Sequence, residues 1–508
     1  MFRKRSPALL LISMLALGLI SLSGCQQLEA SKGTPAANAE NGKIPITTSS
    51  EEARKEFLAG RDLADRLLIQ DSLQHFDKAI AADANFATAE LNRANASNSA
   101  KDFFDHLKKA VSLADKASNG ERLLILATEA GANGNPSKQK DLLEQLVAAY
   151  PNDERAHFTL GGYYFGQQDF PQAISHYKKA TELAPNYSGA FNILGYAYRQ
   201  NGDYANAEQA FKKYTELIPN DPNPYDSYAE LLLKMGRFDE SITQYRKALS
   251  IDQNFIASHL GISADLLYMG KPDEAAAELQ KITEKARSDG DRRTALFGLT
   301  VVNVDSGKMD KALETVDQQY AIAEKNNDPA QMAGDLQTKG NILVEMGKYA
   351  DARAAFERSL KITEGSNLSK EIKDNAAVFH HYNVARIALG TKDLAAAKSE
   401  AEEFRKGSEA SKNSFQIKQA HELMGLIALE EKDYDKAIAE FQQANQQNPY
   451  DLYRLCLAYQ GKGDKAKAQD SCSKAASFNP LPQLNYAFIR TKAQKASAQK
   501  AGSATKPA

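Results

Sequence analysis

The chain has 508 residues, of which 25% are charged and 43% are hydrophobic, and its formal net charge is -2. The balanced charge excludes a strongly basic nucleic-acid binder, and the apolar content excludes a chain that is disordered throughout. At roughly 150 residues per domain this length would suggest about three domains, but most of the chain repeats one pattern instead.

The first 24 residues have the pattern of a secretory signal. Three basic residues at positions 3 to 5 precede an apolar stretch over 8–22, which is shorter than the about 20 residues of a membrane-spanning helix. The stretch ends in Leu-Ser-Gly-Cys at Cys25, which resembles the lipobox of bacterial lipoproteins. That resemblance implies cleavage before Cys25 and acylation of its thiol, and Gln26 after it implies sorting to the outer membrane. An ordinary cleaved signal with an incidental cysteine is the alternative.

Residues 25–50 lack hydrophobic periodicity and are rich in Ser, Thr, Ala, Asn and Gly. This composition is typical of a flexible linker. We therefore expect a flexible tether over 25–50, with the lipidated Cys25 at its start. A coil of that length has an end-to-end distance of roughly 25–30 Å, so it would hold the folded part near a membrane.

Residues 51–150 show helical periodicity with part of the spacing that is clearer further along the chain. Ser72, Phe76 and Ala79 have the small–large–small spacing of a helix that packs in a hairpin. We interpret this region as about three divergent helical hairpins. A small separate helical domain is the alternative.

Residues 151–490 resemble themselves at intervals of about 34 residues. A small residue recurs at Ala173, Ala207, Ser241 and Ala275, each 34 positions after the last. A larger residue lies four positions after each of these, at Tyr177, Phe211, Tyr245 and Leu279. The pattern resembles the tetratricopeptide repeat (TPR). The resemblance implies an all-α fold, an α-solenoid in which about nine helix-turn-helix hairpins form a right-handed superhelix.

Elementary packing agrees with this interpretation. Apolar residues three and four positions apart place one face of each helix inward, and a single hairpin cannot cover that face without its neighbours. Residues 295–304 are rich in Val and Thr, which is typical of a strand. Their place in the repeat nevertheless predicts a helix.

Residues 491–508 contain four lysines and no acidic residue. We expect a disordered basic tail there. Its charge suits contact with anionic lipid or polysaccharide, and a solvated end that contacts nothing is the alternative.

The sequence contains no motif of an enzyme or a metal site. The eight histidines are scattered, and the adjacent His380 and His381 would diverge by about 100° on a helix. A Gly-rich phosphate loop and a nucleophile elbow are both missing from the sequence. We therefore expect no enzymatic activity, no cofactor and no metal site.

Cys456 and Cys472 fall in the first and second helices of one repeat. Two reduced, packed thiols are one interpretation. A disulfide is the other, since export would place them in an oxidising compartment. Such a bond would close a loop of about 16 residues and contribute roughly 3 kcal/mol. The sequence leaves both open.

The resemblance also implies a concave groove lined by the first helix of each hairpin. Aromatic, amide and charged side chains together suit an extended peptide or a partner helix. The candidate partner-binding residues are Phe165, Asn192, Tyr196, Arg199, Asp226, Glu230, Asn341, Tyr382 and Arg386.

These expectations favour a scaffold that is lipid-anchored to the outer membrane on its periplasmic side. It would bind a protein or peptide partner in the assembly or maintenance of a cell-envelope complex. A protein that binds glycan or peptidoglycan fragments in the same groove is the alternative, and a hydrolase with a site between helices is a third hypothesis. The sequence does not identify the partner or the oligomeric state.

Overall fold

The computed structural model describes residues 42–66, 68–97, 100–133, 135–368, 370–411 and 413–498. The expected signal peptide, Cys25, the tether as far as residue 41 and residues 499–508 of the expected tail lie outside these ranges. The described residues are all-helical, with 25 α-helices in paired hairpins and no strand. They divide into two compact units, 42–231 and 232–498, and the division falls inside one helix.

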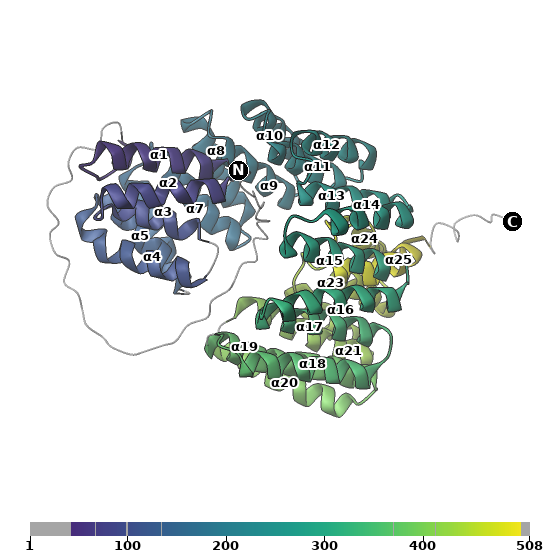
Figure 1. Cartoon of the computed structure of the whole chain (residues 1–508). Helices are drawn as coiled ribbons and strands as arrows, with labels where there is room; N and C mark the ends of the chain where they lie inside the picture. The colour runs from purple at the N-terminus through teal and green to yellow at the C-terminus, as the bar shows by residue number, and fades with distance from the viewer. Residues whose placement is uncertain are drawn as a thin grey trace. The chain divides into compact units, whose positions relative to one another are not determined.

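Unit 1 contains the purple to teal helices of Figure 1. They are α1 (Glu51–Asp65), α2 (Ile69–Ala82), α3 (Ala87–Asn95), α4 (Ala100–Leu113), the short 3-10 helix η2 (Ala114–Lys116), α5 (Asn119–Ala132), α6 (Pro136–Ala149), α7 (Glu154–Gly166), α8 (Phe170–Leu183), α9 (Ser188–Gln200) and α10 (Tyr204–Leu217), with α11 (Pro222–Lys234) crossing the division. Residues 51–150 thus form α1 to α6.

Unit 2 contains the teal to yellow helices of Figure 1. They are α12 (Phe238–Ile251), α13 (Ile256–Tyr268), α14 (Pro272–Lys285), α15 (Asp289–Asp305), α16 (Met309–Lys325), α17 (Pro329–Glu345), α18 (Tyr349–Gly365), α19 (Lys370–Gly390), α20 (Leu394–Ala410), α21 (Ser414–Glu430), α22 (Tyr434–Gln443), α23 (Pro449–Lys462), α24 (Lys465–Ala476) and α25 (Leu484–Ala498). Residues 295–304 are helical, within α15, as their place in the repeat predicts.

Glycine facing an aromatic ring explains how the two helices of a hairpin approach each other. A methyl group on Gly161 of α7 would lie 2.8 Å from the Tyr177 ring of α8, and one on Gly195 of α9 would lie 2.7 Å from the Phe211 ring of α10. Such distances are too short for a real contact, so only glycine fits. The repeated aromatic positions in the sequence are therefore the residues that fill the hairpin crossings.

Local signals set the ends of the helices. Asp169 and Asp203 are the N-cap residues directly before α8 and α10, and their carboxylates accept hydrogen bonds from backbone N–H groups of the first turn. Gly202, in the preceding turn, has φ +80°, a conformation that favours glycine. These residues explain why each hairpin turns at the same place in the repeat.

Residues 43–50 form a strap along unit 1. The Lys43 ammonium lies 2.6 Å from Glu154, the Ile44 N–H donates to Asp153 at 2.9 Å, and the Thr47 N–H donates to Glu121 at 3.0 Å. The strap therefore contacts the first turns of α5 and α7 before α1 begins. This part of the expected flexible tether is built into the folded unit.

The other end of α1 also contacts distant helices of unit 1. Asp65 accepts two hydrogen bonds from Arg155 of α7, at 2.6 and 3.1 Å. The Arg155 guanidinium lies 4.8 Å from the centre of the Tyr187 ring, just before α9. The first hairpin is thereby fastened to the fourth and fifth.

In unit 2, the last helix packs back on the array, and in Figure 1 the yellow α25 lies beside α15 and α24. Tyr486, Ile489 and Ala493 of α25 are buried in one cluster with Val301 and Ile342. Residues 491–498, which we expected in a disordered tail, are the last turns of this helix, and Ala493 is fully buried. The sequence prediction was wrong there because it considered charge without the apolar stripe.

Polar contacts also hold α25 and the segment before it against the helices of unit 2. Arg490 Nε lies 2.7 Å from Asp305 of α15, and Lys492 lies 3.0 Å from Glu345 of α17. The Tyr268 hydroxyl of α13 donates to the Pro480 carbonyl at 2.7 Å. The chain between α24 and α25, together with α25, thus covers the sides of α13, α15 and α17 that a simple open array would expose.

Candidate partner-binding surface

The nine predicted groove residues all lie on odd-numbered helices, on two separate units. Six belong to unit 1, on α7, α9 and α11, and three belong to unit 2, on α17 and α19.

In unit 1, the structure brings three of the predicted residues together. Arg199 of α9 forms an ion pair with Glu230 of α11 at 3.0 Å, and its guanidinium lies 4.6 Å from the centre of the Tyr196 ring. The Tyr196 hydroxyl donates to Ser227 at 3.2 Å. Burial raises the pKa of Tyr196 well above its usual value, so this hydroxyl stays a proton donor. The cluster joins α9 to α11 and neutralises its own charges.

The other three residues of unit 1 lie outside this cluster. Phe165 packs edge-on against Phe170, with 5.7 Å between ring centres. Asp226 is buried, and so is Asn192, which is only 3% exposed. The Asn192 side-chain oxygen has no hydrogen-bond partner among the described residues. Burial makes Asp226 and Asn192 poor first contacts for a partner.

In unit 2, Asn341, Tyr382 and Arg386 form part of a longer polar network. Arg386 donates to Asn341 at 2.6 Å and lies 5.4 Å from the centre of the Tyr382 ring. The Tyr382 hydroxyl donates to Glu422 of α21 at 2.8 Å, and Glu422 pairs with Arg454 of α23. The predicted residues are thus linked through α17, α19, α21 and α23.

At the buried end of this network, the Asp451 carboxyl has a raised pKa. Asp451 is 1% exposed, and its burial, reinforced by the nearby Glu422 carboxylate, raises its pKa well above the usual value. Arg454 lies between the two carboxylates and opposes that effect. Sequence reasoning missed Glu422, Asp451 and Arg454, because nothing local marks a charged residue as one that packs against the next repeat.

An open hollow of about 420 Å³ lies on α6 and α7 of unit 1. Phe158 and Tyr163 contribute aromatic rings, and Gly162 and Gly166 leave its floor without side chains. The other lining residues are Gln139, Thr159 and Gln167. The sequence signal for this hollow is the pair of glycines four positions apart, which lie on one face of a helix.

The hollow and the cluster around Tyr196 lie in the same register of the repeat. Phe158 and Gly162 precede Asn192 and Tyr196 by 34 positions, and Phe165 precedes Arg199 by the same interval. Equivalent positions of successive hairpins line the same side of a solenoid. None of the nine predicted residues lines the hollow, although Phe158 and Gly162 share the repeat register of Asn192 and Tyr196.

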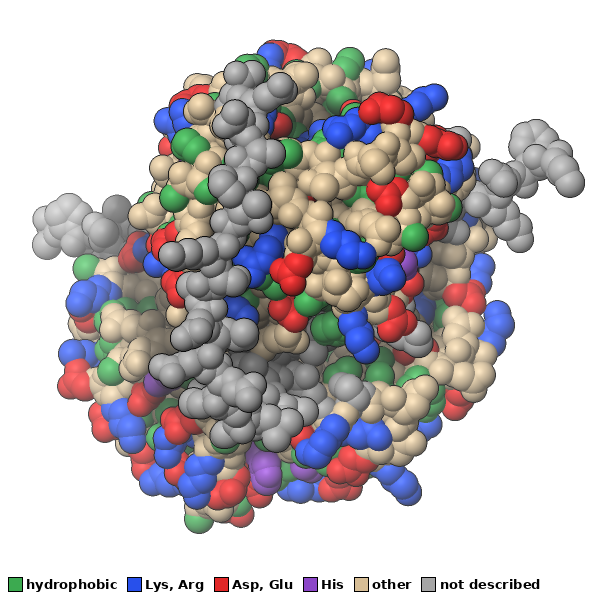
Figure 2. All heavy atoms as spheres, turned by 90° about the vertical axis from the view of Figure 1, so that its left-hand side faces the viewer, with side chains coloured by type: hydrophobic (Ala, Val, Ile, Leu, Met, Phe, Trp, Pro, Cys, Tyr) green, Lys and Arg blue, Asp and Glu red, His purple; other side chains and the backbone are tan. Residues whose placement is uncertain are grey.

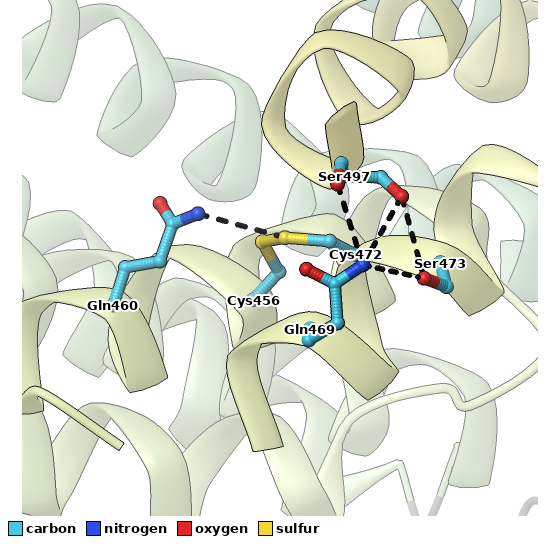
Figure 3. Close-up of a disulfide and its surroundings, with 6 residues drawn as sticks. All are labelled: Cys456, Gln460, Gln469, Cys472, Ser473 and Ser497. Carbon is cyan, nitrogen blue, oxygen red and sulfur yellow. Dashed lines mark hydrogen bonds between the residues drawn. A yellow bond between two sulfur atoms is a disulfide. The ribbon is translucent and has the colours of Figure 1, made fainter. Parts of the chain in front are cut away.

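A disulfide joins Cys456 of α23 to Cys472 of α24, with 5.1 Å between their Cα atoms. Both residues are buried. Beside them, Gln469 donates to Ser473 and to Ser497 of α25, at 3.2 and 3.5 Å (Figure 3). The bond and this polar contact fasten α23, α24 and α25 to one another.

Several histidines that are scattered in the sequence pair across hairpins. In unit 2, Nδ1 of His259 lies 2.6 Å from Glu278, and Nδ1 of His421 lies 2.8 Å from Glu440. His381 and Glu400 make the same contact at 2.7 Å. In unit 1, His157 of α7 faces His176 of α8, and burial lowers the pKa of both, helped at His176 by the neighbouring ring.

Two features are absent from the described ranges. Residues 42–498, with their short gaps, hold no group of three or more His, Cys, Asp and Glu side chains arranged for a metal ion. None of the helices described there has both the length and the apolar character needed to cross a membrane. On the face drawn in Figure 2, basic and acidic side chains are interspersed, in keeping with the small net charge.

The fold is that of a helical-repeat solenoid, and comparison with protein families identifies the repeat. Tetratricopeptide-repeat models match residues 126–188, 158–222, 223–255 and 419–451, and a tetratricopeptide repeat-like domain matches 260–373. The chain is therefore a TPR protein. Repeats of this family generally bind peptides or proteins and are typically not enzymes.

Solved structures match parts of the chain. A TPR protein from Parabacteroides merdae ATCC 43184 is 14% identical and covers 52% of this chain and 98% of its own, with a TM-score of 0.38. MamA from Desulfovibrio magneticus RS-1 is 17% identical and covers 33% and 94%, with a TM-score of 0.30. YrrB, described as a TPR protein with an unusual peptide-binding site, is 18% identical and covers 35% and 91%, with a TM-score of 0.26. No curated protein matches the chain.

Proposed function

We propose that this TPR protein is a lipid-anchored scaffold that binds an extended segment of a protein partner on the α7–α11 surface of unit 1. The observation that carries the proposal is the hollow on α7. Phe158 and Tyr163 offer rings for an apolar side chain, while Gln139, Thr159 and Gln167 offer polar groups for a peptide backbone. The Arg199–Glu230 pair on the neighbouring helices adds polar groups in the same register.

The envelope location rests on two observations of different kinds. The sequence around Cys25 resembles a lipobox, which implies acylation and sorting to the outer membrane. The disulfide between Cys456 and Cys472 suits an oxidising compartment. Acyl chains would anchor the chain without a membrane-spanning helix, because each buried methylene contributes about 0.8 kcal/mol. A scaffold held there would serve the assembly or maintenance of an envelope complex.

Filling the hollow tests the binding surface without weakening the fold. A side chain at Gly162 would meet open space, with only the Tyr177 hydroxyl 3.7 Å from its Cβ. Gly162→Leu should therefore block the hollow and, by removing a helical glycine, leave the protein at least as stable. Gly334→Leu on α17 is the matched control, because no atom lies within 4 Å of its Cβ position.

The readout is site-specific photo-cross-linking from position 159 in the intact envelope. We expect one protein adduct that is retained in Gly334→Leu and lost in Gly162→Leu. An adduct of equal yield in both variants would show that the hollow is not the binding surface.

A second substitution tests the lipid anchor. Cys25→Ala should release the protein from the membrane fraction. In the parent chain, without this substitution, mass spectrometry should find acyl chains on Cys25.

The same hollow also suits a sugar ring, since Phe158 and Tyr163 can stack on its apolar face and the two glutamines can bond its hydroxyls. A glycan or peptidoglycan-fragment binder is therefore the second candidate. Glycan binding that is lost in Gly162→Leu, with an unchanged protein adduct, would favour it over the peptide scaffold.

A further inference from the structure

The pair formed by His157 and His176 takes the place that a histidine and a glutamate hold in other hairpins. In four hairpins, the second member of such a pair is the seventh residue of its helix and lies 19 positions after the histidine. These second members are His176, Glu278, Glu400 and Glu440. Added protons must affect the two kinds of pair differently, because a carboxylate accepts from an imidazolium, whereas a second imidazolium can only donate.

The hydrogen bonds of the neutral pair fix where its protons lie. Nε2 of His157 lies 3.1 Å from the Pro151 carbonyl oxygen, which can only accept, so this nitrogen carries the proton of the ring. Nδ1 of His157 therefore presents a lone pair, and Nδ1 of His176 donates to it at 3.1 Å. The ring centres are 5.4 Å apart, as expected of rings that meet edge to edge through these nitrogens. The bond joins α7 to α8.

A first added proton leaves this bond intact. Since Nδ1 of His176 already carries a proton, the next one enters that ring at Nε2. The resulting imidazolium still donates to His157, and a charged donor makes the stronger hydrogen bond. The Tyr164 ring stacks on His176, with 5.6 Å between ring centres and 12° between the planes, and holds it in this orientation.

A second added proton does not fit the same geometry. It has to enter at Nδ1 of His157, which is the acceptor of the bond, so two cationic N–H groups would face each other across 3.1 Å. Turning the His157 ring away breaks its bond to Pro151, and turning the His176 ring away breaks its stacking on Tyr164. The contact between α7 and α8 must therefore open at this point.

The carboxylates around the pair already have partners. Asp153, just before α7, accepts two backbone hydrogen bonds from the first turn of that helix. Glu144 of α6 lies 3.5 Å from Lys140, and Glu182 of α8 lies 4.0 Å from Lys179. These groups therefore do not replace the carboxylate that the other hairpins place opposite their histidine.

The surroundings also disfavour charge on the two rings. Burial lowers the pKa of both imidazoles, and Lys179 lowers that of His157 further, while the Pro151 carbonyl and Asp153 oppose the shift. A hollow of about 570 Å³ beside the pair is lined by Lys178 and Lys179 as well as by Glu182. The other charged residues of α7 and α9 pair elsewhere, Glu154 with Lys43, Arg155 with Asp65 and Arg199 with Glu230.

The same hairpin carries the hollow of the proposed partner surface. All residues that line that hollow, except Gln139, belong to α7 or directly follow it, and Phe158 is the neighbour of His157. The Phe158 ring packs on Tyr177 of α8, with 5.6 Å between ring centres, and on Tyr187 before α9, with 5.2 Å. A shift of α7 away from α8 therefore displaces this ring and deforms the hollow.

We propose that a second proton on the His157–His176 pair parts α7 from α8 and releases the partner segment from the hollow on α6 and α7. Histidine ordinarily titrates near pH 6.5, so the change falls within reach of mild acid. Because the folded pKa values lie below the unfolded value, the contribution of the pair to stability is complete above about pH 6.5 and falls as the pH drops below it. The release rests on the proposed function, and the opening does not.

Hydrogen exchange of the full-length chain at pH 7.5 and pH 5.0, corrected for intrinsic exchange rates, tests the opening. We expect protection in α7 and α8 to fall by about tenfold at pH 5.0, the equivalent of one pKa unit. Protection in α21 and α22, which the His421–Glu440 pair joins, should not fall in this way. His176→Glu recreates the pair of the other hairpins and should abolish the fall in α7 and α8.

His421→Gln is the matched control, because it removes a histidine–glutamate pair of unit 2 and should leave the fall in α7 and α8 unchanged. If His176→Glu does not fold, His176→Gln takes its place, since an amide can turn its oxygen toward a protonated His157. An equal fall in the parent chain and in the folded His176 variant, or protection in α7 and α8 that does not change with pH, would overturn the proposal.

The photo-adduct from position 159 tests the release separately. In envelopes equilibrated at each pH, its yield should drop at pH 5.0 in the parent chain and stay constant in His176→Glu. A constant yield in the parent chain would overturn the release. An adduct that is missing at both pH values would overturn the proposed function and the release with it, whereas the exchange measurement would still decide the opening.

Discussion

Gly161 and Gly162 are neighbours on α7 and face different surroundings. A Cβ on Gly161 would lie 2.8 Å from the Tyr177 ring, whereas one on Gly162 would come no closer than 3.7 Å to the same side chain, at its hydroxyl. The first glycine permits the hairpin crossing, and the second leaves the hollow open. Their substitutions should therefore have opposite effects.

Alanine at each position gives a matched pair of variants. Gly161→Ala should destabilise unit 1 by about 1–3 kcal/mol, because the added methyl overpacks the crossing with Tyr177. Gly162→Ala should stabilise it by about 1 kcal/mol, because alanine favours the helix and meets no obstacle. Urea unfolding followed by circular dichroism measures both changes, and a shift of the same sign in the two variants would contradict the packing argument.

Asp265 of α13 is a fully buried carboxyl whose burial raises its pKa to about 8, although the Ser241 side chain opposes the shift. A folded-state pKa above the unfolded value means that the native state holds this proton more tightly. The contribution of Asp265 to stability is thus greatest below about pH 4 and falls as the pH rises to about 8.

Asp265→Asn should remove that pH dependence, because an amide resembles the protonated carboxyl and does not titrate. We expect the variant to gain stability over the parent chain between pH 5 and pH 8, and the gain should grow with pH. Urea unfolding of both chains at several pH values within this range measures it. Parallel stability curves for the two proteins would contradict the raised pKa.

At the scale of the element, the sequence predicted the hairpins because each carries its own signals. The glycine–aromatic crossings, the Asp caps and the turn glycine such as Gly202 act within about 34 residues. Local composition misled at residues 491–498, which belong to α25, whereas the repeat correctly predicted a helix at the Val-rich segment of α15. Contacts between distant elements, such as those of α25 with α15 and α17, have no comparable local signal.

The candidate surface was predictable in part for the same reason. The repeat register places the candidate residues on odd-numbered helices. It could not show that Arg199 is already paired with Glu230, or Arg386 with Asn341, because those partners come from other hairpins. The pairing of His157 with His176 was missed for another reason: both belong to one hairpin, but they lie 19 positions apart on its two helices.

The disulfide fastens one hairpin, α23/α24, at the end of the array. Its two cysteines are 16 positions apart, and closing such a loop should contribute about 3 kcal/mol to the stability of unit 2. A chain with both Cys456→Ala and Cys472→Ala should lose about that amount in urea unfolding. Alkylation of the unfolded, non-reduced protein should leave both thiols unmodified, and labelling at either position would contradict the bond.

At the scale of the whole molecule, each unit has a terminal segment that packs back on its helices: the N-terminal segment in unit 1 and the C-terminal segment in unit 2. The strap and α1 fasten unit 1, and α25 is part of the apolar core of unit 2. Ile489 of α25 is fully buried, whereas Gln494 is exposed. The two residues allow the contribution of this closure to be measured.

Ile489→Ala should destabilise unit 2 by about 2–5 kcal/mol, through lost burial and the cavity it leaves. Gln494→Ala, on the exposed face of the same helix, should have little effect. Hydrogen exchange in the Ile489→Ala variant should show lost protection in α15 and α17 and unchanged protection in α7 to α9. Loss of protection in both units at once would contradict the division of the chain into two compact units.

The strap also determines how the molecule would respond to being pulled. If the chain is held at its N-terminus, tension reaches residues 43–50 before it reaches α1. The contacts of Lys43, Ile44 and Thr47 with α5 and α7 would have to rupture before the first hairpin carried any load. The strap would thus detach before any helix unfolds, and residues 43–50 would then add their length to the segment that precedes α1.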